Sequence, residues 1–273
     1  MRRIVHLSDI HFGSVDLAVA ERAVEKINML SPDVVVVSGD LTQRARSKEF
    51  RAARAFLDEL PLPQIVVPGN HDVPLYNVYH RFAKPLDKFR KYITDDLTPA
   101  YIDDEIAVIG INTARSMTIK GGRINKLQVA AIKRQLGELP DDTLKVIVTH
   151  HPFDLPEGHK ERDIVGRAQK LMSTIAECGA DVFLAGHLHM SHFGNTAKRY
   201  KLDNGRAALV IQAGTATSTR GRGEAHSFNV IEFENPIITV RKLDCQSLEL
   251  GFREVQTRRY EHTREGWTPA REA

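Results

Sequence analysis

The stretch at residues 33–40, DVVVVSGD, sets four consecutive valines between an aspartate and a Gly-Asp pair. A continuous β-branched run flanked by turn residues is typical of a strand buried on both faces. Other short apolar runs of the same kind lie at 3–8 (RIVHLS), 64–67 (QIVV), 106–111 (IAVIGI), 144–149 (LKVIVT) and 181–185 (DVFLA). These runs predict the buried strands of a central sheet.

Segments with helical periodicity separate these runs. Apolar residues recur at helical spacing in 17–30, 48–60, 125–138 and 165–178. The alternation of strand and helix predicts βα units around a largely parallel sheet. Beyond His189 the pattern changes, and strands joined by turns are expected at 197–203, 206–213, 228–233 and 237–243. We expect this second set of strands to complete another sheet, packed on the first.

The composition excludes several classes of protein. The chain has 273 residues and 42% hydrophobic content, which is ample for a dry core. A net charge of +3, from 38 basic and 35 acidic residues, does not indicate a nucleic-acid or membrane partner. No stretch approaches the ~18 apolar residues of a membrane span, so a cytoplasmic protein is expected. Whether it forms a homo-oligomer is left open.

Five short polar clusters each follow a predicted strand. They are Asp9-Ile10-His11, Gly39-Asp40, Gly69-Asn70-His71-Asp72, His150-His151-Pro152 and Gly186-His187-Leu188-His189. Each cluster alone is compatible with an ordinary turn or a solvated histidine. The carboxyl edge of an open α/β sheet is where ligands bind, because the loops there converge. Together the clusters therefore predict one site, rich in oxygen and imidazole donors.

The order D-x-H, G-D, G-N-H-[D/E], H and G-H-x-H, which spans residues 9–189, resembles the signature of the calcineurin-like metallophosphoesterase family. The resemblance implies an α/β fold, a four-layer αββα sandwich of two mixed β-sheets, with a dinuclear metal centre at the strand ends. The chain looks similar to the bacterial branch with cyclic-nucleotide phosphodiesterases and glycerophosphodiesterases. That finer likeness depends on the overall layout and on residues 213–224, AGTATSTRGRGE.

The resemblance also implies which residues hold the metals. One ion is assigned to Asp9, His11 and His189, the other to Asn70, His150 and His187, with Asp40 as the bridge. Imidazoles favour first-row transition metals, so two divalent ions such as manganese, iron or zinc are expected. Two ions roughly 3.5–4 Å apart acidify a shared water and clamp the oxygens of an in-line displacement.

Three residues beside the implied ligands are assigned supporting roles. His71 is predicted to protonate the leaving alkoxide or to stabilise charge on the phosphoryl oxygens. Asp72 either orients this histidine or pins the loop. His151 is expected to fill the core or to support a ligand, with substrate contact as the less favoured alternative.

Arginines at the same edge are candidates for substrate contact. Arg220 and Arg222 lie in a Gly-rich turn, and Arg115 follows the run at 106–111. Guanidinium groups bind phosphate through paired hydrogen bonds. The alternative is that these are ordinary exposed arginines.

The chain is divided into a catalytic domain at 1–245 and a polar C-terminal tail at 246–273, either solvated or an oligomer arm. An insert at 73–104 leaves directly from the Asn70–Asp72 loop and concentrates aromatic residues with interleaved lysines and arginines. This insert is either a cap over the metal site or a peripheral helix pair.

The predicted function is hydrolysis of a small-molecule phosphodiester, either a cyclic nucleotide or a glycerophosphodiester. The enzyme alternatives are a phosphomonoesterase and a nucleotide-sugar or lipid pyrophosphatase. A nuclease is least favoured among the enzymes, because no basic stripe runs along the chain beyond the insert. A non-catalytic binding module is disfavoured, because every implied ligand position is intact.

Overall fold

Two β-sheets form the centre of the molecule. The computed structural model describes residues 1–118, 121–156, 163–196, 199–200, 207–219, 223–264 and 266–270. A seven-stranded sheet has the order β13-β12-β11-β10-β1-β2-β3. Its strands are β1 (Arg2–Leu7), β2 (Val34–Val37), β3 (Gln64–Val66), β10 (His226–Glu234), β11 (Ile237–Cys245), β12 (Phe252–Thr263) and β13 (Gly266–Pro269). Within it β1 runs parallel to β2 and antiparallel to β10.

The second sheet has six strands in the order β4-β5-β6-β7-β9-β8. They are β4 (Ala100–Ile102), β5 (Ile106–Gly110), β6 (Leu144–Val148), β7 (Val182–Ala185), β8 (His192–Asn195) and β9 (Leu209–Gln212). Strands β5, β6, β7 and β9 are parallel, and the edge strands β4 and β8 are antiparallel to their neighbours. Both sheets are therefore mixed.

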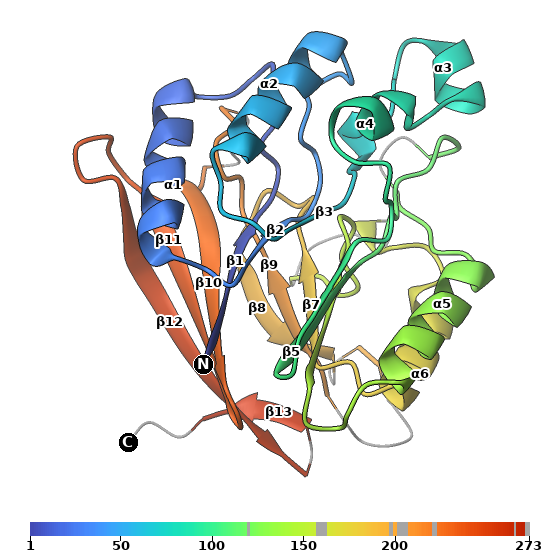
Figure 1. Ribbon diagram of the computed structural model, residues 1–273, viewed down its shortest axis with the longest axis vertical. Helices are drawn as coiled ribbons and strands as arrows, with labels where there is room; N and C mark the ends of the chain where they lie inside the picture. Colours follow the sequence, from blue (N-terminus) through green and yellow to red (C-terminus); the bar gives the residue numbers. More distant parts are fainter. Residues whose placement is uncertain are drawn as a thin grey trace.

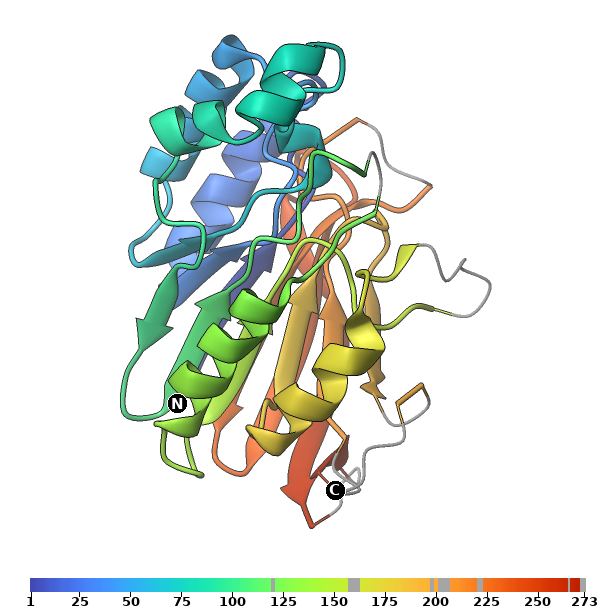
Figure 2. The same ribbon diagram turned by 90° about the vertical axis from the view of Figure 1, so that its right-hand side faces the viewer.

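Helices cover the outer face of each sheet (Figures 1 and 2). Helices α1 (Leu17–Leu30) and α2 (Ser47–Asp58) lie on the seven-stranded sheet, and α5 (Lys126–Gly137) and α6 (Ala168–Glu177) lie on the six-stranded sheet. The four layers confirm the predicted αββα sandwich. Among the described residues, no helix has both the length and the apolar character needed to cross a membrane.

The valine run of β2 shows why these strands are apolar throughout. Val34 and Val36 belong to the core between the two sheets, where they join residues of β5, β6, β7 and β9. Val35 and Val37 point to the other face and pack with α1 and α2. Because both faces are covered, alternation between apolar and polar residues is absent, as expected for a strand in an inner layer.

The insert at 73–104 contains two short helices and β4. Helix α4 (Asp87–Tyr92) packs on α2, where the rings of Phe89 and Tyr92 lie 6.5 and 6.3 Å from the ring of Phe50. Strand β4 extends the six-stranded sheet at its edge. This half of the insert packs peripherally. Around α3 (Val78–Ala83) the chain instead leaves Tyr76, Tyr79 and Phe82 exposed.

The prediction of a solvated tail at 246–273 is wrong for the residues that the structure describes. Residues 252–261 of β12 pair antiparallel with β11, and β13 pairs with the end of β12. Phe252 and Trp267, each 3% exposed, anchor these strands in the two cores. The charged residues that suggested a tail occupy exposed positions of β12, which has few apolar anchors.

A second difference concerns the strand expected at 197–203. The antiparallel edge strand is β8, which ends at Asn195. Residues 197–198 and 201–206 lie outside the described residues, and Arg199 and Tyr200 are not in a strand.

Candidate metal centre

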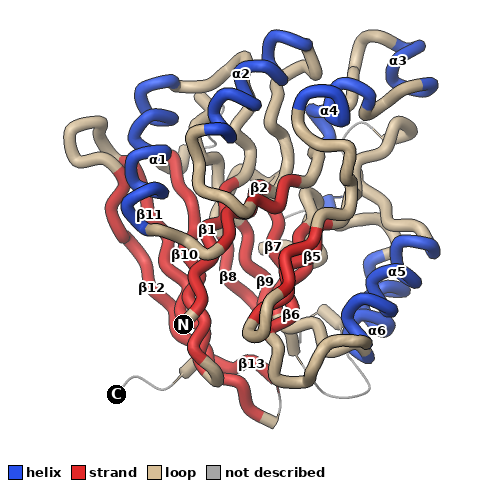
Figure 3. Tube along the Cα trace, in the orientation of Figure 1, coloured by secondary structure: helices blue, strands red, loops and turns tan. Residues whose placement is uncertain are grey.

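The predicted ligands come together where the carboxyl ends of the two sheets meet. Asp9 and His11 follow β1, Asp40 follows β2, and Asn70 begins the short helix η1 (Asn70–Asp72) after β3. From the other sheet, His150 follows β6, while His187 and His189 follow β7. Figure 3 shows the loops after these strands at the end of the molecule where α3 and α4 also lie.

The first group consists of Asp9, His11 and His189. Asp9 Oδ1 lies 3.6 Å from His11 Nε2 and 3.4 Å from His189 Nε2. The two imidazole Nε2 atoms are themselves 3.4 Å apart. All three donor atoms lie within 4.8 Å of one another, which is the spacing of ligands around one ion.

The second group surrounds His150. Its Nε2 atom lies 3.1 Å from Asn70 Oδ1, 3.3 Å from His187 Nδ1 and 3.4 Å from Asp40 Oδ2. Asp40 Oδ2 also lies 3.7 Å from His11 Nε2, so this carboxylate stands between the two groups. The structure thus brings all the predicted ligands together, with Asp40 in the position of a bridge.

Backbone strain accompanies these side chains. Five of the predicted ligands have left-handed backbone, with φ of 54° at Asp9, 56° at His11, 54° at Asp40, 75° at His187 and 57° at His189. Non-glycine residues in this region cost roughly 1 kcal/mol or more each and cluster at functional sites. The surrounding fold therefore holds these residues in place against a local preference.

The glycines in the clusters allow close backbone approach. A Cβ on Gly69 would lie 2.1 Å from Asp40 Oδ1, and one on Gly186 would lie 1.7 Å from Ser8 Oγ. At Gly39, where φ is +93°, a Cβ would lie 2.7 Å from His150 Nδ1. These contacts explain why a glycine precedes the ligand in each of these clusters.

Hydrogen bonds from neighbouring groups set the tautomers of the ligand histidines. His150 Nδ1 donates to the carbonyl oxygen of Ser38 at 2.8 Å, because a carbonyl only accepts. Nε2 is therefore the nitrogen that would face a metal ion shared with Asp40 and Asn70. His189 Nδ1 lies 2.8 Å from the Thr215 hydroxyl. Such partners orient metal-binding imidazoles and fix which nitrogen is available to the metal.

Charge is concentrated in this buried centre. Burial favours a raised pKa for Asp40, but the imidazoles of His150 and His11 outweigh it and hold the pKa well below the usual range. Burial likewise lowers the pKa of His150, but the carboxylates of Asp40 and Asp9 raise it to about 9. The pKa of His187 falls to about 4, through burial and the neighbouring His150.

The donor set fits a pair of transition-metal ions. Asp9 Oδ1 is buried and accepts no hydrogen bond from the described residues, although His11 and His189 face it. A buried carboxylate oxygen without a donor is costly unless a cation neutralises it. Imidazole nitrogens and carboxylate oxygens are ligands of zinc, iron and manganese.

His71 lies beside this group, and its ring is fixed. The Nδ1 atom donates to the carbonyl oxygen of Gln43 at 3.0 Å, and the backbone N–H donates to Asp40 Oδ1 at 2.8 Å. The ring stands edge-on to that of His11, with 4.9 Å between centroids. Nε2 is thus the nitrogen of this ring suited to proton transfer.

Asp72 ties two catalytic loops together. Its buried carboxylate accepts hydrogen bonds from the backbone N–H groups of Leu41, Thr42 and Gly69 and from the Thr42 hydroxyl, at 2.9–3.2 Å. Burial and the charge of Asp40 raise its pKa to about 6. These contacts favour the predicted role of pinning the loop.

His151 supports its neighbours. Its Nδ1 lies 2.8 Å from the Thr113 hydroxyl, and its ring lies 4.7 Å from that of His187. The ring is fully buried, which favours the supporting role over substrate contact.

The structure describes one of the three candidate arginines, Arg115. Arg220 and Arg222 lie outside the described residues. Arg115 donates to the carbonyl oxygens of Asn112 and Ala114 and to the Gln128 side chain, and so ties its own loop to α5. Burial lowers the pKa of its guanidinium.

Ser38, Thr42, Gln43 and Thr215 support the site and were not predicted to do so. Two of them act through a backbone carbonyl, for which the residue type gives no signal. Thr215 lies in the segment 213–224, and only its placement opposite His189 shows its role.

Comparisons with known proteins agree with this geometry. A family model described as calcineurin-like phosphoesterase matches residues 2–191. A glycerophosphodiester phosphodiesterase of Enterobacter lignolyticus is 28% identical over 202 residues, which cover 68% of this chain and 70% of that protein. A cAMP/cGMP dual specificity phosphodiesterase of Mycobacterium tuberculosis is 25% identical over 268 residues, covering 84% and 74%.

Two solved structures share the fold at low sequence identity. A purple acid phosphatase from yellow lupin seeds has a TM-score of 0.70 at 11% identity, over 94% of this chain and 53% of the phosphatase. A dimetal phosphatase from Danio rerio has a TM-score of 0.66 at 12% identity, over 88% and 95%.

Proposed function

The chain belongs to the calcineurin-like phosphoesterase family, and on that premise we propose that it hydrolyses a small phosphodiester. The family and the phosphodiesterase relatives make it a metal-dependent phosphoric ester hydrolase. A substrate of the glycerophosphodiester or cyclic-nucleotide kind is supported by the two relatives, which are named for those substrates. The observation that carries the proposal is the convergence of both ligand groups on Asp40.

Two divalent transition-metal ions are proposed as cofactors. The residues that would hold them are Asp9, His11 and His189 on one side and Asn70, His150 and His187 on the other, with Asp40 shared. Such ions, when bound, act as Lewis acids toward the phosphoryl oxygens and lower the pKa of coordinated water. The donor atoms accept manganese, iron or zinc, so the identity of the metals follows from their supply.

A side chain of the protein would protonate the leaving oxygen. With Nδ1–H held by Gln43, a protonated His71 carries its second proton on Nε2. That proton passes to the alkoxide as the P–O bond breaks, which leaves the ring neutral. Asp72 keeps the loop of His71 fixed to Leu41 and Thr42, so the donor does not need to be ordered during the reaction.

The exposed aromatics around α3 are proposed to contact the organic part of the substrate. Their segment leaves directly from η1, and Tyr76 is held by Arg44, whose Nη1 donates to the phenolic oxygen at 2.6 Å. The guanidinium also lies 5.1 Å from the centre of the Tyr76 ring. Tyr79 is 68% exposed, so it has surface to offer to a ligand.

A substrate panel on metal-reconstituted protein tests the proposal. We expect bis-p-nitrophenyl phosphate to be hydrolysed faster than p-nitrophenyl phosphate, and glycerophosphodiesters or cyclic nucleotides to be turned over. Asp40→Ala serves as the control for contaminating phosphatases. Preference for the monoester would indicate a phosphomonoesterase, and preference for a nucleotide-sugar or lipid pyrophosphate would indicate a pyrophosphatase. Either outcome would overturn the diester proposal.

A further inference from the structure

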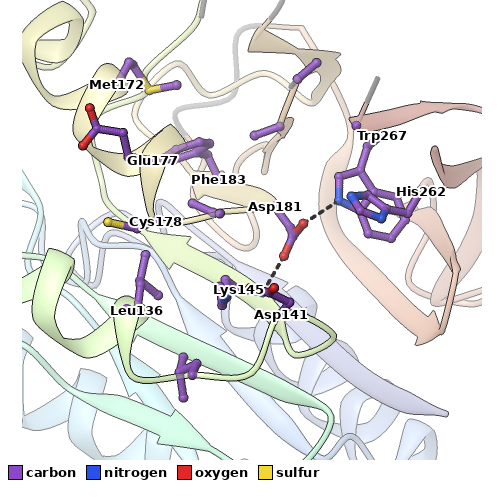
Figure 4. Close-up of a pocket in the computed structure, with 17 residues that line it drawn as sticks. Leu136, Asp141, Lys145, Met172, Glu177, Cys178, Asp181, Phe183, His262 and Trp267 are labelled. Carbon is purple, nitrogen blue, oxygen red and sulfur yellow. Dashed lines mark hydrogen bonds between the residues drawn. The ribbon is translucent and has the colours of Figure 1, made fainter. Parts of the chain in front are cut away.

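A cavity lies at the opposite ends of β6 and β7 from the candidate metal centre. It has a volume of about 210 Å³ and lies among the ends of α5 and α6, the starts of β6 and β7, and β13 (Figure 4). Lys145 is the second residue of β6, and Asp181 directly precedes β7. The ligands His150 and His187 follow the other ends of these strands. The cavity is therefore distinct from the catalytic site.

Lys145 is the unusual feature of this cavity. Its neighbours Leu144 and Val146 belong to the core between the sheets, so Lys145 points to the opposite, helix-covered face. The residue is only 4% exposed, yet it lines the cavity. Its Nζ forms no hydrogen bond or ion pair with any residue in the described ranges; a Cβ added to Gly179 would lie 3.6 Å away. A largely buried ammonium group without a hydrogen bond or ion pair is costly, although the carboxylate of Asp181 interacts with it at longer range.

The other charged groups of the cavity already have partners or face solvent. Both Asp181 oxygens accept hydrogen bonds, one from the Lys145 backbone N–H at 2.8 Å and one from Trp267 Nε1 at 2.9 Å. Glu177 forms an ion pair with Lys133 at 3.3 Å. Asp141 and His262 are exposed at the rim. The Lys145 ammonium group is left with donors for a ligand.

Apolar side chains form one part of the cavity wall, and polar groups supply the larger part of its surface. The apolar side chains include Leu136 and Leu139 from the α5 side, Met172 from α6, Phe183 from β7 and Trp267 from β13. The volume is below the roughly 300–1,000 Å³ of pockets for drug-sized ligands, so an occupant must be small. An ammonium group beside these apolar side chains suits a molecule with one negative end and an apolar body.

We propose that this cavity binds a small organic anion, with its carboxylate on Lys145 Nζ and its apolar body against Phe183, Met172 and Trp267. This site is separate from the proposed phosphodiesterase activity and does not depend on it.

Trp267 gives a direct readout, because it is the single tryptophan of the chain. The test titrates the full chain with hexanoate, its uncharged analogue hexanamide, and acetate, while tryptophan fluorescence is followed. We expect a saturable change with hexanoate, and binding at least about tenfold weaker for hexanamide, which lacks the charge, and for acetate, which lacks the body. The tenfold limit corresponds to about 1.4 kcal/mol.

Matched variants assign the binding to Lys145. Lys145→Met should weaken hexanoate binding by about tenfold or more, whereas Lys126→Met, which removes an exposed lysine at the opposite end of α5, should leave it unchanged. Lys145→Gln replaces Lys145→Met if the latter does not fold. The proposal is overturned if hexanoate gives no saturable change, if hexanamide or acetate binds as tightly, or if the Lys145 variants bind like the unaltered chain. The comparison of hexanoate with hexanamide needs no variant.

Discussion

The Nε2 atoms of His11 and His189 lie 3.4 Å apart, although 178 residues separate them in the chain. Their rings are stacked, with 5.1 Å between centroids and 12° between planes. His11 follows β1 of the seven-stranded sheet, and His189 follows β7 of the six-stranded sheet. Two nitrogens at this distance need a proton or a cation between them, so this pair joins the two sheets through the metal centre.

Removal of the bridging carboxylate should empty both metal positions. Asp40→Ala takes away the carboxylate that stands between the two ligand groups, so the variant should lose most of both ions. Elemental analysis of the purified protein measures the loss. Asp58→Ala, which removes a carboxylate paired with Arg54 on the surface of α2, is the control and should keep its metals. Unchanged metal content in Asp40→Ala would rule out a bridging role.

Loss of the proposed acid should affect chemistry and leave the metals bound. His71→Ala should lower kcat by roughly 10²–10⁴-fold, as is typical of general acid–base groups. The loss should be smaller for p-nitrophenyl esters, because p-nitrophenolate leaves without a proton. His80→Ala, a half-buried histidine of α3, serves as the control. Equal losses on good and poor leaving groups would instead indicate that His71 positions the phosphate.

Truncation of the exposed aromatics should raise KM for the natural substrate. Stacking of a base on an aromatic ring is worth ~1–3 kcal/mol, which corresponds to roughly a 5- to 150-fold increase in KM for Tyr76→Ala or Tyr79→Ala. A small generic diester should respond little, because it lacks the organic group. Tyr101→Ala, on the edge strand β4, is the matched control. If both substrates respond alike, the segment around α3 has only a packing role.

The C-terminal strands should contribute strongly to stability. Trp267 is 3% exposed, packs 6.4 Å from the ring of Phe233 and donates to Asp181. Trp267→Ala should therefore lower the free energy of unfolding by about 3–5 kcal/mol, as in other core truncations of large aromatics. Denaturant unfolding measures the change. Arg258→Ala, at an exposed position of β12, should change it by less than about 0.5 kcal/mol.

The contribution of Asp181 to stability should decrease as pH rises, which is the opposite of the usual behaviour of a carboxyl group. Burial raises its pKa above 3.8, so the folded protein binds this proton more tightly than the unfolded chain does. The stability that it contributes is present below the unfolded pKa and falls as pH rises through the folded pKa. We expect the free energy of unfolding, relative to Asp181→Asn, to decrease as pH rises above the ordinary carboxyl value of 3.8. A flat or rising difference would contradict the shift.

The buried strands were predictable from the sequence because burial on both faces removes any polar alternation. The run at Val34–Val37 is the clearest case. β12 was missed for the opposite reason, since its anchors Phe252 and Tyr260 are far apart and exposed charged residues fill the space between them. β8 was also missed, because all of its residues are only half-buried. Strands at sheet edges have few buried residues, so their sequences show little hydrophobic pattern.

The convergence of the candidate ligands could be predicted because each follows a strand, and parallel strands end at one edge. The groups that orient these side chains could not be predicted. The carbonyl oxygens of Ser38 and Gln43 are chosen by the path of the backbone, and any residue type offers such a group. The cavity at Lys145 could not be predicted either. A lysine in an apolar run is expected to be exposed, and only the placement of the helices shows that it is buried.

The place of β1 in its sheet has a consequence for the order in which the protein folds. The candidate ligand residues have all been synthesised once the ribosome passes His189. Strand β1, which Asp9 follows, nevertheless lacks its antiparallel neighbour until β10 emerges. Until then one edge of β1 has unpaired backbone groups, which invite association with other chains. The sheet that frames the candidate metal centre is therefore incomplete on the nascent chain until β10 has been made.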